Sequence, residues 1–162
     1  MKRIFVGFVI AIIAAMTCFL AACGDKSGDK KSFDGRYETV AIVVEGTTYN
    51  VGDQIPENLV TEKAYTVRSQ DMIVVIGKQS NSSIEKGSFA YQRSLGGGME
   101  TSSGNWFGND DGSVEFRFTP GTSYSMELTD EGQLIFKREW RFKSDNEEHE
   151  ISFILEKVEQ NS

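Results

Sequence analysis

Cysteine and histidine are scarce in this chain of 162 residues, which holds two cysteines and one histidine. Both cysteines, Cys18 and Cys23, lie near the N-terminus, so the long segment after them contains none. That segment can therefore form no internal disulfide and no cysteine-ligated metal site, and it offers no thiol for catalysis. The one histidine, His149, stands among scattered acids without the ligand spacing of a metal motif.

Positive charge is also in the minority, because 17 Lys and Arg face 24 Asp and Glu, for a formal net charge of −7. An acidic surface argues against nucleic acid as a partner. Catalytic patterns are missing too: G-x-S-x-G is absent, and fragments that resemble S-x-x-K, S-D-N and K-T-G come in the wrong order. We therefore expect no enzyme and no cofactor, while a carboxylate pair drawn from different strands, as in a glycosidase, stays open.

The N-terminal segment is the one long apolar run. Residues 1–3 are MKR, and residues 4–20 are almost entirely apolar. A basic start, a hydrophobic middle and small residues before a cut form an export signal. The alternative is an uncleaved anchor, because residues 4–22 approach the ~20 that span a bilayer. Both interpretations keep the basic start inside and place the rest of the chain outside the cytoplasm.

Leu20-Ala21-Ala22-Cys23 closes this apolar run. The four residues resemble the lipobox of bacterial lipoproteins, in which an aliphatic residue and two small residues precede a cysteine. The resemblance implies that residues 1–22 are a cleaved signal peptide and that Cys23 becomes a lipidated N-terminus. Several acyl chains would then hold the protein in the cell membrane, on its extracytoplasmic face. Residues 23–32 have no apolar residue after Cys23, so they form a flexible tether.

Strand patterns fill residues 33–158, a length that suits one domain, and residues 159–162 form a tail. Alternating or β-branched runs predict strands at 36–46, 47–51, 64–67, 72–78, 88–92, 113–118, 123–128, 133–142 and 149–158. Turn residues separate them at 109–112, 119–121, 129–132 and 144–148. A short turn of helix is expected after Pro56. The pattern predicts an all-β domain, either an antiparallel barrel or a β-sandwich.

Several short motifs lie in this domain: Phe33-Asp34-Gly35-Arg36-Tyr37, EGTTY at 45–49, GNW at 104–106 and LEKV at 155–158. Together they resemble the lipocalin-like domains of small bacterial lipoproteins, across most of the domain. The resemblance implies an up-and-down β-barrel. In that family a Gly-x-aromatic opens the first strand, here with Tyr37 in place of Trp, and a basic residue packs over it. Arg138 matches this basic residue, because it alternates in phase with the apolar residues of its predicted strand.

Large rings are the candidate ligand-binding residues of such a barrel. The candidates, with one cation among them, are Tyr37, Phe89, Tyr91, Trp106, Phe116, Phe118, Arg138, Trp140 and Phe142. An eight-stranded barrel is either filled by its own side chains or holds one small ligand. We expect a non-catalytic protein that binds a small apolar ligand in a cavity whose mouth lies near residues 95–112. The alternative is a solid barrel that serves as a protein-interaction or envelope-structural module.

Three local features have two interpretations each. Residues 95–112 are a lid or docking tip around Trp106, or they contain a strand that packs Trp106 into the core. Asp110 and Asp111 hold calcium, or their turn only closes a hairpin. His149 binds a metal with a nearby carboxylate, or it is a solvated residue at the entry of a strand. We favour the second interpretation in each case and expect no metal.

Overall fold

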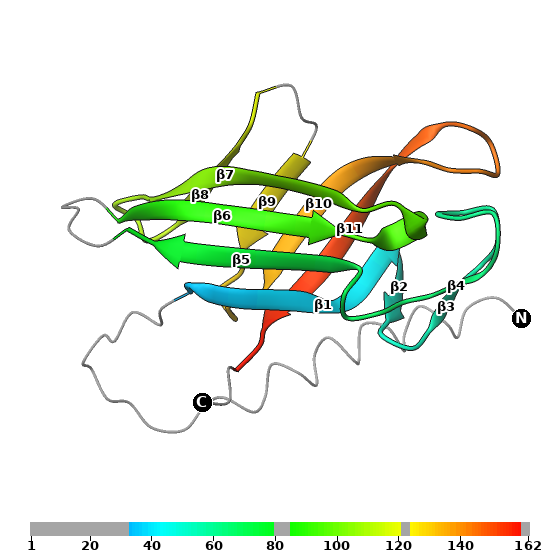
Figure 1. Cartoon of the computed structure of the whole chain (residues 1–162), viewed down its shortest axis with the longest axis horizontal. Helices are drawn as coiled ribbons and strands as arrows, with labels where there is room; N and C mark the ends of the chain where they lie inside the picture. The colour runs from blue at the N-terminus through cyan, green and yellow to red at the C-terminus, as the bar shows by residue number, and fades with distance from the viewer. Residues whose placement is uncertain (1–32, 80–84, 121–123, 160–162) are drawn as a thin grey trace, which may run out of the picture. The chain divides into compact units, whose positions relative to one another are not determined.

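The computed structural model describes residues 33–79, 85–120 and 124–159, which form one antiparallel barrel (Figure 1). Its strands are β1 (Gly35–Val44), β5 (Met72–Lys78), β6 (Lys86–Arg93), β7 (Glu100–Gly108), β8 (Val114–Phe118), β9 (Tyr124–Leu128), β10 (Leu134–Arg141) and β11 (Glu148–Lys157). Their order is β8-β7-β6-β5-β1-β11-β10-β9, a nearly closed sheet of eight strands consistent with a lipocalin-like up-and-down barrel. The predicted fold class is confirmed. Cys23 and the predicted signal peptide and tether lie outside the described residues.

Strand β1 bends in its middle and changes partner there. Its first half pairs with β5, while Ala41–Val44 pairs with the short strand β2 (Thr47–Asn50). A register shift between Thr39 and Ala41 marks the bend, as expected of a β-bulge. The hydroxyl of Thr39 accepts a hydrogen bond from the Met72 amide (2.9 Å) and donates one to the Met72 carbonyl (3.0 Å). This buried side chain therefore replaces the ladder that β1 and β5 lose at the bend.

The remaining elements cover one end of the barrel. They are the small hairpin of β3 (Gln54–Ile55) and β4 (Tyr65–Thr66), and the 3₁₀ turn η1 (Leu95–Gly97). Figure 1 shows them at the same end as the connection from β10 to β11. Hydrogen bonds join these segments: the amide of Lys143 donates to the carbonyl of Leu59 at 3.2 Å. This end is called the rim below.

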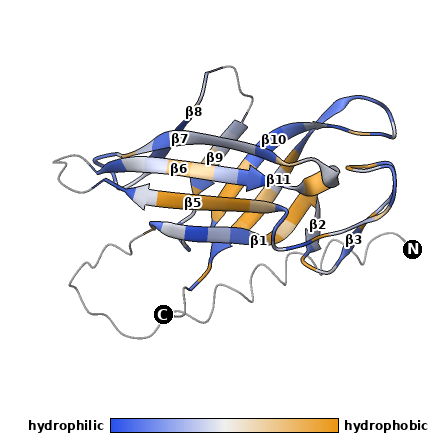
Figure 2. Ribbon diagram, in the orientation of Figure 1, coloured by the Kyte–Doolittle hydropathy of each residue, from blue (hydrophilic) through white to orange (hydrophobic). Residues whose placement is uncertain are grey.

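Alternation along each strand sends apolar side chains inward. Figure 2 shows the apolar residues concentrated on β5, on β11 and on the second half of β1. Aliphatic residues of these strands, such as Ile42, Val74 and Leu155, are fully buried. Burial of side chains of this size contributes about 1.5–3 kcal/mol each relative to exposure, so this face supplies much of the free energy of folding.

The sheet has one gap, between β8 and β9, which we call the seam. These strands lie next to each other, but no backbone ladder joins their described residues. Side chains close the gap: the rings of Phe118 and Tyr124 meet at 5.9 Å between centroids. Because β8 is short, it pairs only with Gly104–Gly108. The first half of β7 pairs with β6 on one side and has no strand partner among the described residues on the side toward the seam. Short edge strands of this kind resist pairing with other chains.

The predicted elements agree with the structure except at three places, the first of which is β3, a strand that no pattern predicted. Residues 100–108 form the full strand β7, so the lid interpretation of 95–112 is wrong and the strand interpretation is right. The segment after Pro56 is an irregular turn, while the 3₁₀ turn lies at Leu95–Gly97. Glycines at positive φ, Gly96 (76°) and Gly97 (82°), allow that tight reversal before β7. Within the described ranges, the structure contains no helix of the length and hydropathy needed to cross a bilayer.

Candidate functional site

The interior of the barrel is occupied by aromatic rings, beginning with two glycine–aromatic pairs on β6 and β7. Gly87 lies opposite Trp106, and Phe89 lies opposite Gly104. A Cβ on Gly104 would stand 2.5 Å from the Phe89 ring, and a Cβ on Gly87 would stand 2.5 Å from the Trp106 indole. Each ring therefore takes the space that a side chain would need on the opposite strand. The two glycines are required because rings fill this part of the barrel.

A second group of rings continues the filling toward the rim. Its members are Phe89, Tyr91, Phe118, Tyr124 and Phe136, with centroid distances of 5.0 Å for Phe89–Phe118, 5.0 Å for Tyr91–Phe136 and 5.6 Å for Phe118–Phe136. Most of these contacts are edge-to-face, which is the favourable arrangement for aromatic pairs. The described interior is thus packed in the way that protein cores are, rather than hollow.

The nine predicted site residues separate into different places. Those fully buried are Tyr37, Phe89, Tyr91, Trp106 and Phe142, and those half-buried against the core are Phe116, Phe118, Arg138 and Trp140. The rings belong to the packed interior or to its two ends. Of the nine, Arg138 and Trp140 line a cavity at the rim, while Phe89 and Phe118 line a second cavity described below. The inward direction of these residues is as predicted, but they do not surround one central ligand cavity.

The expectation that Arg138 packs over Tyr37 is wrong. The Arg138 guanidinium carbon lies 4.9 Å from the ring centroid of Tyr124 and 5.2 Å from that of Trp140. The reason is the register: Arg138 pairs with Ile151, and Ile151 pairs with Val44, at the far end of β1 from Tyr37. Tyr37 instead donates its hydroxyl hydrogen to the carbonyl of Phe33 at 2.8 Å. Burial raises the pKa of this hydroxyl to about 12, with a smaller effect from Asp34.

Glu100 is the centre of a charged cluster at the rim. Its Oε2 accepts hydrogen bonds from Arg93 (Nε, 3.1 Å; Nη2, 3.0 Å) and from Arg138 (Nη1, 2.9 Å). Its Oε1 accepts from the hydroxyls of Tyr91 (3.0 Å) and Tyr124 (2.5 Å). One carboxylate from β7 therefore binds side chains of β6, β9 and β10, and it joins the two sides of the seam where the backbone ladder is missing.

These partners hold Glu100 in its ionised form. Burial raises its pKa, but hydrogen bonds from Tyr124, Arg138 and Tyr91 outweigh that effect and hold the pKa at about 2, below the ordinary 4.5. The pKa of Tyr91 rises in turn, first through burial and then through its bond to the carboxylate. A carboxylate has about four lone-pair positions, and Glu100 accepts from five donors. It is therefore saturated and a poor proton acceptor at neutral pH.

Trp140 stands beside this cluster and forms part of an open cavity. Its indole Nε1 donates to the carbonyl of Val60 at 3.0 Å, and the Arg93 guanidinium lies 4.7 Å from its ring centroid. Gly96 lies against the edge of the same ring. The cavity has a volume of about 740 Å³, within the usual range of ligand pockets. We call Arg93, Glu100, Arg138, Trp140 and this cavity the rim site.

The charge of the rim site contrasts with that of the whole chain. The cavity is lined by five basic side chains (Lys63, Arg93, Arg138, Arg141 and Lys143) and three acidic ones (Glu62, Glu139 and Glu148). With Glu100 behind its wall, the site keeps one positive charge in excess. The side chains of Arg93 and Arg138 are only 11% and 14% exposed. An excess cation so far from bulk water favours an anion as its partner.

A second cavity, of about 730 Å³, lies against the outer side of β5, β6 and β7. Small or polar residues such as Ser88, Ala90 and Asn105 line it together with the rings of Phe89 and Phe118. The guanidinium of Arg117 is bound to Glu115 (2.8 Å) and lies over the ring of Phe107 (4.4 Å). No charge is left unbalanced among these residues, so this cavity offers less for recognition than the rim site does.

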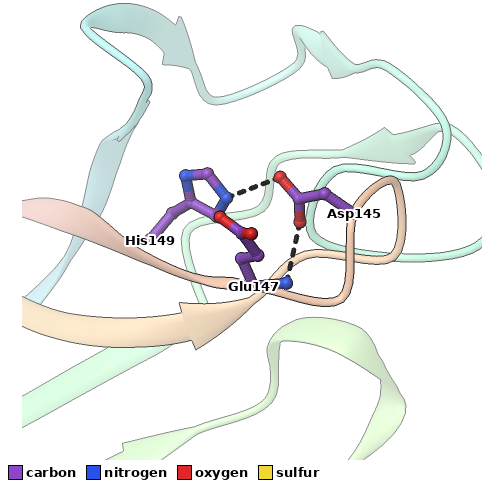
Figure 3. A group of neighbouring side chains, drawn as sticks. All are labelled: Asp145, Glu147 and His149. Carbon is purple, nitrogen blue, oxygen red and sulfur yellow. Dashed lines mark hydrogen bonds and ion pairs between the residues drawn. The ribbon is translucent and has the colours of Figure 1, made fainter.

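His149 lies at the entry of β11, as expected, but its side chain is only 26% exposed and has structural partners that the sequence did not indicate. Its ring stacks on that of Phe142, with 4.2 Å between centroids and 15° between planes. Figure 3 shows its Nε2 bonded to Asp145 (2.8 Å), with Glu147 beside them. Its Nδ1 lies 3.6 Å from Glu45, on the hairpin that joins β1 to β2. The imidazole therefore connects two hairpins at the rim.

Asp145, Glu147 and His149 are the residues best placed for a metal ion, with ligand atoms within 4.8 Å of one another. Asp145 is committed elsewhere: it accepts from the Glu147 amide at 2.9 Å as well as from the imidazole. These bonds, the backbone one first, lower the pKa of its carboxyl. Both acids are exposed, and a cation would have to replace the Asp145–His149 bond. In this structure the group therefore stabilises the turn between β10 and β11.

The Asp110–Asp111 turn closes the β7–β8 hairpin, as its structural interpretation predicts. Asp111 accepts hydrogen bonds from the Ser113 amide (2.9 Å) and hydroxyl (2.6 Å), and these bonds lower the pKa of its carboxyl. Gly112 at φ 87° completes the reversal.

Sequence reasoning missed Arg93, Glu100 and Tyr124. Arg93 was in phase with Phe89 and Tyr91, so alternation would have pointed it inward once the strand was extended by one residue. Glu100 follows a run of glycines and carries no local signal. No protein-family model, no curated protein and no solved structure matches this chain. The rim site therefore rests on its own geometry.

Proposed function

We propose that this protein is a lipid-anchored, extracytoplasmic binding protein that takes its ligand at the rim of the barrel and catalyses no reaction. One observation carries the location: rings fill the interior, while a cavity of about 740 Å³ with Trp140 on its wall lies at the rim. The anchor is supported by the lipobox-like Leu20-Ala21-Ala22-Cys23 and by the polar stretch after it.

A binding role agrees with the chemistry of the rim site. Glu100 is ionised and saturated by its donors, so it is unsuited to acid or base catalysis. The guanidiniums of Arg93 and Arg138 offer hydrogen-bond donors and no acceptor. These groups instead supply fixed hydrogen-bond donors and positive charge next to an indole, which are means of recognition.

The filled interior also favours the second candidate, a module that binds an envelope protein through the same rim. Because rings fill the interior of the barrel, a protein partner would have to contact the outer surface. A protein partner would cover Trp140 and compete with small ligands for the cavity.

The location is tested with the full-length protein labelled with ¹⁵N on its indoles, which gives one NMR signal for Trp106 and one for Trp140. Trp106→Phe and Trp140→Phe assign the two signals. Addition of 2-naphthylacetate or of its neutral amide, 2-naphthylacetamide, should move the Trp140 signal saturably and leave that of Trp106 in place. A shift of Trp106 alone would place the ligand inside the barrel, and no shift with either probe would contradict the proposal.

The anchor is tested by Cys23→Ala. This variant should leave the membrane fraction or accumulate as an uncleaved precursor, because it lacks the thiol that takes the lipid. Processing and membrane retention equal to those of the wild type would show that the lipobox interpretation is wrong.

A further inference from the structure

We infer that the rim site selects a ligand with a single negative charge, a carboxylate or a sulfonate, attached to an apolar body, and that Arg138 binds the anionic group. This inference rests on the proposed binding at the rim and names the class of ligand.

The first argument is charge balance. Arg93 and Arg138 share the single carboxylate of Glu100, with N–O distances of 3.0 and 2.9 Å. One positive charge is therefore uncompensated in a place where both guanidiniums are largely removed from water. Charges held in this way are unfavourable unless a counter-ion meets them. A monoanion in the cavity supplies the missing charge.

The second argument is a count of donors. Arg93 uses all its nitrogens, because Nε and Nη2 donate to Glu100 and Nη1 donates to the carbonyl of Leu95 at 2.6 Å. Arg138 uses Nη1 on Glu100 and Nε on the carbonyl of Glu139 at 3.2 Å. Its Nη2 has no acceptor among the residues described. The two hydrogens of this nitrogen are therefore available to donate to a carboxylate oxygen.

The third argument concerns the rest of the ligand. Next to Arg138 the cavity wall is formed by the indole of Trp140, by Val60 and by Gly96. The edge of the indole lies so near Gly96 that a Cβ there would stand 3.2 Å from it, so this glycine keeps the wall open. An apolar body of the size of a bicyclic ring fits a cavity of about 740 Å³.

The acidic residues of the wall limit the charge that is accepted. Glu62 and Glu139 line the cavity, and Glu139 is exposed. A second negative charge on the ligand would meet these carboxylates after the one uncompensated cation is satisfied. A phosphate monoester, which carries close to two charges, should therefore bind no better than a carboxylate.

The test uses the full-length protein and three probes of equal ring size: 2-naphthylacetate, 2-naphthylacetamide and 2-naphthyl phosphate. The Trp140 indole signal gives the Kd of each. Naphthylacetate should bind at least about tenfold more tightly than the amide, since a hydrogen bond to a charged group contributes on the order of 1.5–3 kcal/mol. Arg138→Gln should abolish that ratio, Arg138→Lys should keep part of it, and Arg117→Gln, on the outer face, should leave it unchanged.

The outcomes separate the inference from the proposed function. Equal Kd values for 2-naphthylacetate and 2-naphthylacetamide would overturn the inference and leave binding at the rim intact. A naphthyl phosphate that binds tenfold more tightly than the acetate would overturn the selection for one charge. No shift with any probe would overturn both. If Arg138→Gln does not fold, which loss of indole signal dispersion reveals, the probe ratios in the wild type and in Arg138→Lys decide.

Discussion

The two tryptophans of the barrel make the same hydrogen bond in opposite surroundings. The indole of Trp106 donates to the carbonyl of Gly77 at 2.9 Å, and that of Trp140 donates to the carbonyl of Val60 at 3.0 Å. Trp106 is 1% exposed, while Trp140 is half-buried beside a cavity.

Their neighbours explain the difference. Trp106 lies over Gly87 and meets the ring of Phe33 at 4.6 Å, so small and apolar groups seal it in the core. The guanidiniums of Arg93 and Arg138 lie 4.7 and 5.2 Å from the ring centroid of Trp140, which also borders an open cavity. The same residue type is thus structural at one end and suited to recognition at the other.

The largest expected effect comes from removing the two rings in turn. Trp106→Ala should lower the free energy of unfolding by about 4 kcal/mol, because it empties a fully packed position. Trp140→Ala should cost about half as much, since its ring already borders a cavity. Urea unfolding of both variants measures the difference, and equal costs would contradict the contrast drawn between them.

Glu100→Gln sharpens the comparison at the rim. The amide keeps the size of the side chain but leaves two largely buried guanidiniums without a counter-charge, which should cost about 3 kcal/mol. Glu127→Gln is the control, because the exposed Glu127–Lys137 pair (3.9 Å) contributes at most a few tenths of a kcal/mol. If the two variants are equally stable, the Glu100 cluster does not stabilise the seam.

The same cluster predicts a pH dependence. The pKa of Glu100 is about 2 in the folded protein, below the ordinary 4.5, so the stability that its charge contributes is fully present above about pH 4.5. That stability is lost as the pH falls from 4.5 toward 2. The difference between wild type and Glu100→Gln, measured by urea unfolding, should be constant from pH 5 to 8 and shrink below pH 4.5. A difference that does not change in acid would show that the folded carboxyl is not held ionised.

Gly87→Ala tests how tightly Trp106 is sealed. The added methyl would stand 1.9 Å from the Gly77 carbonyl oxygen, which is the acceptor of the Trp106 indole. We expect a loss of about 2 kcal/mol by urea unfolding, with a shift of the Trp106 indole signal. Gly98→Ala is the matched control, because nothing lies within 4 Å of its Cβ position and its backbone is extended. Equal behaviour of the two variants would mean that the ring does not require this glycine.

The smallest effect is expected for His149→Ala. Loss of the stack on Phe142 and of the bond to Asp145 should lower the free energy of unfolding by about 1 kcal/mol. Asp130→Ala, at the tip of the β9–β10 turn, should change it by less than about 0.5 kcal/mol. A histidine variant as stable as the wild type would return His149 to the solvated role that the sequence suggested.

Most strands could be predicted from the sequence because alternation and turn residues are local signals. The segment 134–142 alternates clearly, and its turns are rich in Gly, Asp and Asn. Strand β7 was uncertain because two of its inward positions are Ser102 and Gly104, small residues that make room for rings of neighbouring strands. These positions of β7 lack apolar side chains because rings from other strands take the space. A local sequence pattern cannot show this.

The rim site was predictable only in part for the same reason. Phase along β10 placed Arg138 and Trp140 inward, but their partner Glu100 lies 38 residues before Arg138 and on the other side of the seam. Strand register decides which residues meet across a closed barrel. The predicted contact between Arg138 and Tyr37 had the correct phase but the wrong register, so it was misplaced.

The ladder between β1 and β11 affects when the chain can fold during its synthesis. It pairs Tyr37 with Lys157, so the first strand of the barrel depends on the last. Contacts this distant in sequence form late and make folding slow. A barrel built in this way stays open until its final ten residues have been synthesised. An incomplete chain therefore lacks the strand that closes the barrel, and a chain that has not yet folded suits the export that we propose.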